Sequence, residues 1–263
     1  MKYVNSIIGK DGGFSDYLRG MFYAYYALPE EEYDTQLHIH ESLAMAKVFK
    51  NVKLFHCNFP HNFAYLDQPH QFHVVINDLK DNDHAHASFC MIPPEECFAQ
   101  PKPRAVERFR ELITFKEPYR TQINAVCDRL TNGEPYRVVV CRCGDYAFEN
   151  CPLEEHNIKT AVDRILNVSA GIPTVFVCDY EPVTDRVLSQ REDFISYRFA
   201  PCYLCRYTGP VEGCLPILTA YQLLCNASEI YNFGRWHGWE SGFARYPAKI
   251  FGIPYHYIHM NFY

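Results

Sequence analysis

Short apolar runs that alternate with helical patterns constrain the fold of this 263-residue chain more than any other feature. Two of these runs, residues 136–141 and 174–178, are rich in valine and are bounded by polar residues. Runs of this kind are typical of strands that are buried on both faces of a parallel sheet, because helices then cover both faces. The alternation therefore predicts an α/β fold with mainly parallel sheets.

The same pattern predicts elements along the whole chain. Strands are expected at residues 3–8, 35–40, 52–55, 72–76, 136–141, 174–178, 229–233 and 254–259. Helices are expected at residues 14–28, 43–49, 104–130, 156–166, 183–188 and 216–225, and another begins after residue 241. The breaker Thr-Asn-Gly-Glu-Pro at residues 131–135 separates two α/β halves. We therefore expect two Rossmann-like domains, residues 1–131 and 132–263, whose sheets face a central ligand-binding cleft.

Composition excludes several classes of protein. A hydrophobic content of 48% and an aromatic content of 16% provide ample core, which excludes global disorder. The net charge of -6 argues against a nucleic-acid binder, which normally carries a basic surface. Apolar runs stay well below the roughly 18 residues of a membrane span, and residues 1–9 are too short and polar for a signal peptide. We expect a soluble, cytosolic protein.

The 12 cysteines fit that location as reduced core thiols. Cys141, Cys178 and Cys225 lie in apolar runs, where a free cysteine behaves as a small hydrophobic residue.

Residues 236–245, Trp-His-Gly-Trp-Glu-Ser-Gly-Phe-Ala-Arg, connect an expected strand to an expected helix. Free backbone N–H groups and the helix dipole favour a phosphate at such a helix start. The candidate phosphate-binding residues are Ser241, Gly242 and Phe243, and Trp236 and Trp239 are positioned to stack on a base or sugar. The alternative is an ordinary turn between strand and helix.

A glycine-rich segment at residues 9–20 follows the first strand and opens the first helix. Gly12 and Gly13, followed by Phe14, allow a ligand to approach the backbone. The spacing is not the G-x-G-x-x-G fingerprint, so it does not support a nicotinamide cofactor.

Charged residues follow the first two expected strands of the second half. Arg142 ends one buried run, where a guanidinium is costly unless it meets an anion, and it is suited to clamp a diphosphate. Asp145 could orient that group or a sugar hydroxyl, or it could pair with Arg142 to cap the turn. Asp179 follows the next strand and is a candidate to contact the purine or the ribose of a nucleotide. The alternative is that it is the N-cap residue of the next helix.

These four segments lie in the order in which fucosyltransferase-like GT-B glycosyltransferases carry their motifs. Residues 9–20 resemble the glycine-rich G-x-F-G-N start, and residues 241–245 are similar to the S-S-x-x-x-R or S-G-F-S segment. The resemblance covers most of the chain after residue 132 and about 45 residues at the start.

The two strand ends also match motifs of this family. The first is similar to H-x-R-R-x-D, with Arg142 and Asp145 in place, and the second resembles T-D-x-P, with Asp179 at the acid. The departures are Val140 for the family's histidine, Cys143 for its second arginine, and Ser15 or Asp16 for the asparagine of the first motif.

The resemblance implies transfer of a sugar from a nucleotide-diphospho-sugar to a glycan or glycoprotein, by an inverting reaction that needs no metal or other cofactor. GDP-fucose is favoured, and GDP-rhamnose and UDP-xylose are alternatives. Arg142 and the loop at 241–243 would stabilise the leaving diphosphate. The candidates for the catalytic base are Asp11, Asp16, Glu41 and Asp145. Asp11 and Asp16 lie in the acceptor half, although acids there also favour a helix start.

Other readings remain open. Asp81 and Asp83, with His84 and His86, could serve a metal-dependent transferase, although a solvated turn is favoured. His38 and His40 lie on one strand face and could bind a metal or acceptor. A non-catalytic carbohydrate-binding protein with a degenerate transferase fold is a further alternative.

A zinc site is also conceivable at Cys141 and Cys143 with Cys202 and Cys205. We expect Cys141 to point away from Cys143, which disfavours such a site.

Overall fold

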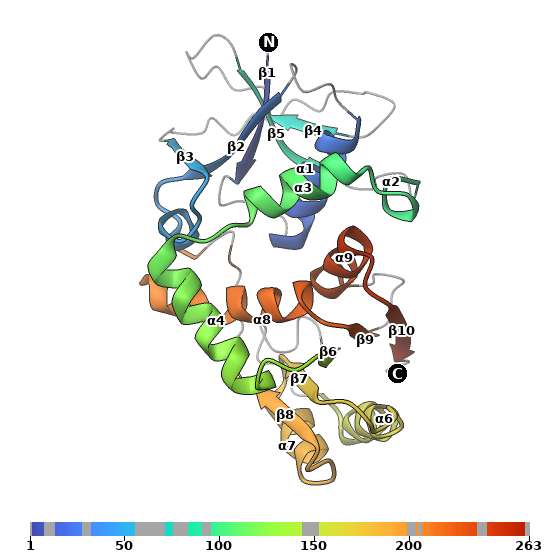
Figure 1. Ribbon diagram of the computed structural model, residues 1–263. Coiled ribbons are helices and arrows are strands. Elements are labelled where there is room, and N and C mark those ends of the chain that lie inside the picture. The colour runs from blue at the N-terminus through green and yellow to red at the C-terminus, as the bar shows by residue number, and fades with distance from the viewer. Residues whose placement is uncertain are drawn as a thin grey trace. The chain divides into compact units, whose positions relative to one another are not determined.

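The computed structural model contains two compact units, each built on its own sheet (Figure 1). The N-terminal unit comprises Met1–Arg120 and Tyr203–Cys214, and the C-terminal unit comprises Thr121–Cys202 and Leu215–Tyr263. The structure describes residues 2–7, 14–27, 33–55, 72–75, 84–90, 96–143, 153–198, 204, 207–235 and 241–260. The division between an acceptor half and a donor half at residues 131 and 132 stays a prediction.

The N-terminal unit has a five-stranded sheet in the order β3-β2-β1-β5-β4. Its strands are β1 (Lys2–Ile7), β2 (Tyr33–His40), β3 (Val52–Phe55), β4 (Phe72–Val75) and β5 (His84–Cys90). Only β4 runs antiparallel to its neighbour among these described strands. Its helical segments are α1 (Phe14–Ala27), η2 (Ala44–Lys47), α2 (Glu96–Ala99), α3 (Pro103–Leu112) and η4 (Val211–Gly213). Helix α1 begins at Phe14, within the glycine-rich segment at residues 9–20, as the sequence predicts, whereas Gly12 and Gly13 lie outside the described residues.

Aromatic rings fill the core of this unit. The ring of Phe22 stacks on Phe98 with centroids 5.5 Å apart and meets the ring of Phe109 edge-on at 6.0 Å. Such pairs contribute beyond the area that they bury. The aromatic excess of the sequence is therefore used, at least here, for packing.

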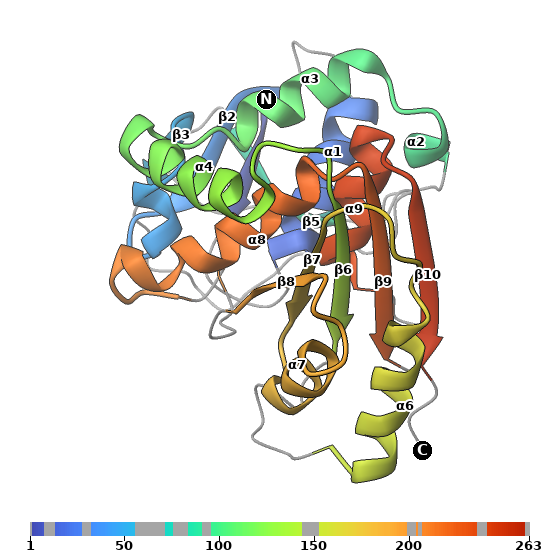
Figure 2. The ribbon, with the colours of Figure 1, turned by 60° about the horizontal axis from the view of Figure 1, so that its bottom comes forward.

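The C-terminal unit has a wholly parallel five-stranded sheet in the order β10-β9-β6-β7-β8. Its strands are β6 (Arg137–Arg142), β7 (Thr174–Cys178), β8 (Phe194–Tyr197), β9 (Glu229–Arg235) and β10 (Tyr255–Met260). Its helices are α6 (Glu155–Leu166), α7 (Glu181–Leu188), α8 (Leu215–Cys225) and α9 (Gly242–Phe251), and α4 (Glu117–Thr131) leads into it. Helices α6 and α7 cover one face of the sheet, and α8 and α9 cover the other (Figure 2).

A charged cluster links three strands at the amino-terminal edge of this sheet. The Arg137 guanidinium on β6 donates from Nε to Glu229 Oε2 on β9 at 2.7 Å. His256 on β10 lies 2.9 Å from the other carboxylate oxygen, and its ring stacks on Tyr231. Arg137 is nearly buried, so this carboxylate compensates a charge that would otherwise be costly in the core.

Most predicted elements are confirmed within one or two residues, but two predicted helices differ, and strands β5 and β8 and the short segments α2 and η4 were not predicted. The predicted helix at 104–130 is two helices, because Pro118 has no backbone N–H to continue a helix and instead lies in the first turn of α4, while Phe115 bridges to Phe49. The predicted helix at 43–49 is the single turn η2. Strand β8 was not predicted, because three of its four residues are only half-buried and it lacks an apolar run.

The described helices include none that is both long and apolar enough to cross a bilayer. Cys141 and Cys178 are buried thiols outside any disulfide, as expected, and Cys225 is half-buried.

Candidate functional site

The strand order of the C-terminal unit creates a switch point beside β6. The chain places β7 and then β8 on one side of β6, and it then returns to place β9 and β10 on the other side. The helices that follow β6 and β9 in the chain, α6 and α9, lie on opposite faces of the sheet. Ligands of open α/β sheets bind beyond the carboxyl ends of the strands at such a point. The carboxyl end of β6 carries Arg142, and β9 leads toward α9.

Arg142 and Asp179 lie at the carboxyl ends of two neighbouring strands, β6 and β7. Arg142 is the last residue of β6 and is half-buried, and Asp179 comes directly after β7. The backbone N–H of Cys143 donates a hydrogen bond of 2.8 Å to Asp179 Oδ1. Tyr180, not Asp179, is the N-cap residue of α7. The carboxylate therefore joins the two strand ends instead of capping the helix.

The electrostatic surroundings of Asp179 raise the pKa of its carboxyl to about 7. Burial is the largest cause, and the neighbouring thiol of Cys178 acts in the same direction. The N–H of Cys143 and the positive charge of Arg142 oppose the rise. At neutral pH this carboxyl can thus either accept or donate a hydrogen bond.

Helix α9 begins at a side-chain cap. Ser241 is its N-cap residue, and the hydroxyl oxygen accepts a hydrogen bond of 3.4 Å from the backbone N–H of Phe243. The first turn contains no acidic residue, so no carboxylate there offsets the positive end of the helix dipole. The Phe243 ring meets the edge of Tyr221 at 5.5 Å, which anchors the turn to α8. Ser241, Gly242 and Phe243 are each partly accessible to solvent.

Comparison with solved structures identifies the fold. The crystal structure of NodZ alpha-1,6-fucosyltransferase soaked with GDP-fucose matches with a TM-score of 0.53 and 16% identity, over 94% of this chain and 92% of that chain. The structure co-crystallized with GDP matches with a TM-score of 0.52 and 16% identity, over 93% and 91%. Fucosyltransferase NodZ from Bradyrhizobium gives 0.51 and 17% identity, over 93% and 92%.

This chain has the NodZ fold. No protein-family model and no curated protein sequence matches it. The predicted α/β fold of the GT-B type, and the predicted resemblance to the fucosyltransferase-like superfamily, are confirmed at the level of the fold.

Several residues predicted for the site lie outside the described part of this NodZ-like chain. They are Asp11, Gly12, Gly13, Asp81, Asp83, Asp145, Cys202, Cys205, Trp236 and Trp239. The backbones of Asp16, His84 and His86 are described in α1 and β5, but their side chains are not. Their predicted roles stay predictions.

The other predicted residues of the N-terminal unit are described. Phe14 is buried at the start of α1, where its ring packs near Phe49 with centroids 6.1 Å apart. Glu41 is exposed and His38 is buried. His40 Nδ1 lies 2.8 Å from the Ser42 hydroxyl, within a local turn. Phe14 is thus a core residue of the NodZ-like fold in addition to any role beside a ligand.

The expectation that Cys141 points away from Cys143 is wrong. The two sulfur atoms lie 3.9 Å apart, because residues two positions apart along extended backbone project to the same face. Cys178 on β7 completes the group, with all three sulfur atoms within 4.8 Å of one another. The sequence signal for this cluster was the Cys-x-Cys spacing at the end of β6 and just after it, together with a cysteine that ends the next buried strand.

Proposed function

We propose that this chain is a glycosyltransferase that moves a sugar from a nucleotide-diphospho-sugar to a hydroxyl group of a glycan or glycoprotein. The observation that carries the proposal is the placement of Arg142 and Asp179 on adjacent strand ends at the switch point of a sheet with the NodZ fold. GDP-fucose is the favoured donor, since two of the NodZ structures were soaked with GDP-fucose or co-crystallized with GDP.

The donor half comprises residues 132–263, where two features act on the diphosphate. The guanidinium of Arg142 binds its oxygens through paired hydrogen bonds, and the start of α9 offers backbone N–H groups and a positive dipole end. Both interactions strengthen as charge develops on the departing nucleoside diphosphate. Asp179 accepts a hydrogen bond from the base or ribose.

The reaction breaks the bond between the anomeric carbon and the diphosphate oxygen and forms a bond to the acceptor oxygen on the opposite face. The configuration is therefore inverted. The proton of the acceptor hydroxyl passes to a carboxylate, for which Asp11 and Asp16 of the acceptor half, residues 1–131, are the leading candidates. Glu41 and Asp145 are the other candidates for the catalytic base. No metal ion takes part, because Arg142 and α9 neutralise the leaving group.

The test is a panel of GDP- and UDP-sugars incubated with the purified chain and mixed glycan acceptors, with release of nucleoside diphosphate as the readout. We expect release from GDP-fucose, or from GDP-rhamnose or UDP-xylose, that persists in EDTA. Thermal unfolding in the presence of GDP and UDP measures binding independently. Absence of both release and stabilisation, where a known transferase responds, would refute the proposal.

The remaining outcomes separate the alternatives. Carbohydrate binding without nucleotide binding or turnover would indicate a non-catalytic protein with this fold. Turnover that requires Mn²⁺ would instead favour a reaction supported by Asp81 and Asp83.

A further inference from the structure

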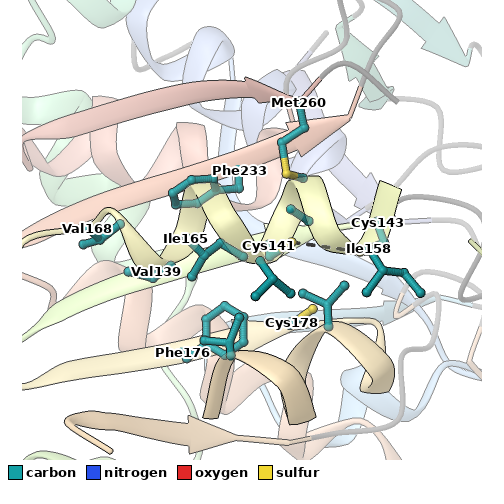
Figure 3. Packing of buried hydrophobic residues seen from close by; sticks show 14 of the residues in the cluster. Val139, Cys141, Cys143, Ile158, Ile165, Val168, Phe176, Cys178, Phe233 and Met260 are labelled. Carbon is teal, nitrogen blue, oxygen red and sulfur yellow. Dashed lines mark hydrogen bonds between the residues drawn. The ribbon is translucent and has the colours of Figure 1, made fainter. Parts of the chain in front are cut away.

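Three thiols gather on the face of the C-terminal sheet that α6 and α7 cover. Cys141 pairs in register with Cys178 across β6 and β7, and Cys143 lies two residues further along on the same face as Cys141. The sulfur atoms of Cys141 and Cys143 are 3.9 Å apart, and all three lie within 4.8 Å of one another (Figure 3). Cys141 and Cys178 lie on neighbouring strands whose register sets their spacing, and Cys143 directly follows β6.

The cluster is enclosed by apolar side chains. Cys141, Cys143 and Cys178 are only 1%, 0% and 8% exposed, and they share a core with residues of α6 such as Ile158 and Val162. The backbone N–H of Tyr180 approaches the Cys178 sulfur at 3.4 Å. Among the described His, Cys, Asp and Glu side chains, those that gather in this cluster offer only sulfur atoms as ligands. Soft ions select such a donor set, whereas Mg²⁺, Ca²⁺ and Mn²⁺ select oxygen.

The spacing between the sulfur atoms of Cys141 and Cys143 suits a metal ion. With metal–sulfur bonds of about 2.3 Å, two sulfur ligands lie about 3.8 Å apart in a tetrahedral site and about 4.0 Å apart in a trigonal one. The distance of 3.9 Å between Cys141 and Cys143 falls in this range. A disulfide between these two residues fits less well, because alternate strand residues are about 6.6 Å apart along the chain and a disulfide needs close Cβ atoms.

We propose that Cys141, Cys143 and Cys178 bind one thiophilic metal ion, Cu⁺, in a three-coordinate site beneath the switch point. Among the residues that the structure describes, the cluster offers three sulfur ligands and no fourth His, Cys, Asp or Glu ligand atom, and this set favours Cu⁺ over Zn²⁺, which takes four ligands in structural sites. The ion clamps β6 to β7 just below Arg142 and Asp179 and takes no part in sugar transfer. The site is independent of the proposed function, because it rests on the thiol cluster alone.

The test is anaerobic titration of the reduced, full-length chain with Cu⁺ in competition with a chromogenic chelator, and a parallel titration with Zn²⁺. We expect one Cu⁺ per chain, with an affinity that falls at least about a hundredfold in the Cys141→Ala, Cys143→Ala and Cys178→Ala variants. Cys127→Ala is the matched control, because Cys127 is a buried free thiol on α4 that is not part of the cluster. This control should bind like the wild type.

X-ray absorption of the Cu⁺-loaded wild type keeps the test decisive if a variant fails to fold. A spectrum that shows three sulfur ligands at about 2.3 Å from the metal ion would support the site. Unchanged Cu⁺ affinity in folded Cys178→Ala, or a wild-type spectrum without three sulfur ligands, would overturn it. Tighter binding of Zn²⁺ than of Cu⁺ would overturn the three-coordinate assignment.

Discussion

The backbone N–H of Cys143 donates a hydrogen bond of 2.8 Å to the carboxylate of Asp179 and so joins the residue that follows β6 to the residue that follows β7. Parallel strands leave the N–H and C=O groups of their last residues without ladder partners. Here the side chain of Asp179 supplies one of the missing acceptors. The same contact holds the carboxylate at the switch point, close to the charge of Arg142.

This contact predicts different effects for two substitutions of Asp179. Asp179→Asn keeps an oxygen that can accept from Cys143, whereas Asp179→Ala leaves a buried N–H without its partner. We expect the alanine variant to be less stable than the asparagine variant by about 1 kcal/mol, as measured by urea unfolding. Both variants should bind GDP more weakly if the carboxylate contacts the donor. Equal stabilities of the two variants would contradict the role of the hydrogen bond.

Arg142 is expected to contribute most to stabilisation of the leaving group. Arg142→Ala should lower turnover about a hundredfold or more. The turnover of Arg142→Lys should lie between those of the wild type and the alanine variant, because lysine keeps the charge but not the paired donors. Steady-state release of nucleoside diphosphate measures both effects.

Arg198 provides the matched control for Arg142. It follows β8 at the same edge of the same sheet, but it is exposed and pairs with Glu181 and Asp185. Arg198→Ala should leave turnover near the wild-type value. Full activity of Arg142→Ala would exclude the proposed role of Arg142.

Two substitutions of Ser241 test separately the capping of α9 and the proposed binding of a phosphate at its start. Ser241→Ala removes the side-chain cap and should destabilise the chain by up to about 1 kcal/mol. Ser241→Asp keeps a good cap but adds a negative charge where the diphosphate is proposed to bind. We therefore expect near-wild-type stability and at least about tenfold weaker GDP binding, as measured by calorimetry. Unweakened GDP binding by the aspartate variant would argue against a phosphate at this helix.

The ion pair between Arg137 and Glu229 predicts a pH-dependent contribution to stability. Burial acts to raise the pKa of Glu229, but hydrogen bonds from Arg137 and His256 outweigh it and lower that pKa from its usual 4.5. A carboxyl whose pKa is lower in the folded state stabilises the fold above its ordinary pKa, and this stabilisation is lost as the pH falls through the lowered value.

We therefore expect Glu229→Gln to destabilise the chain by about 2 kcal/mol at neutral pH, since it leaves the nearly buried Arg137 without its charge partner. The difference from the wild type should shrink as the pH falls below 4.5. Glu155→Gln is the control, because Glu155 pairs with Arg186 on the exposed surface and its removal should change stability little. Urea unfolding between pH 3 and 7 measures both variants. A difference that grows on acidification would contradict the sign of this linkage.

Local sequence patterns were sufficient to predict most elements of this fold. Strands β6 and β7 follow from unbroken apolar runs, and the break after α4 follows from Asn132 and Gly133, which both adopt positive φ. The separation of α3 from α4 required more, because Phe115 leaves the helical pattern for a partner distant in sequence, Phe49. Patterns that depend on such partners cannot be recognised within a short window of sequence.

The sequence by itself determined which residues end the buried strands, and it thereby identified Arg142 and Asp179 and the capped helix start at Ser241. These features depend on local hydrophobicity and on local hydrogen bonding of the backbone. The tertiary structure alone decided which strand ends become neighbours. The order β10-β9-β6-β7-β8 puts the switch point beside β6, and the register of β6 with β7 brings Cys141 and Cys178 together. Strand order depends on which segments far apart in the chain form hydrogen bonds with one another, and the pattern of one short segment does not name its neighbour.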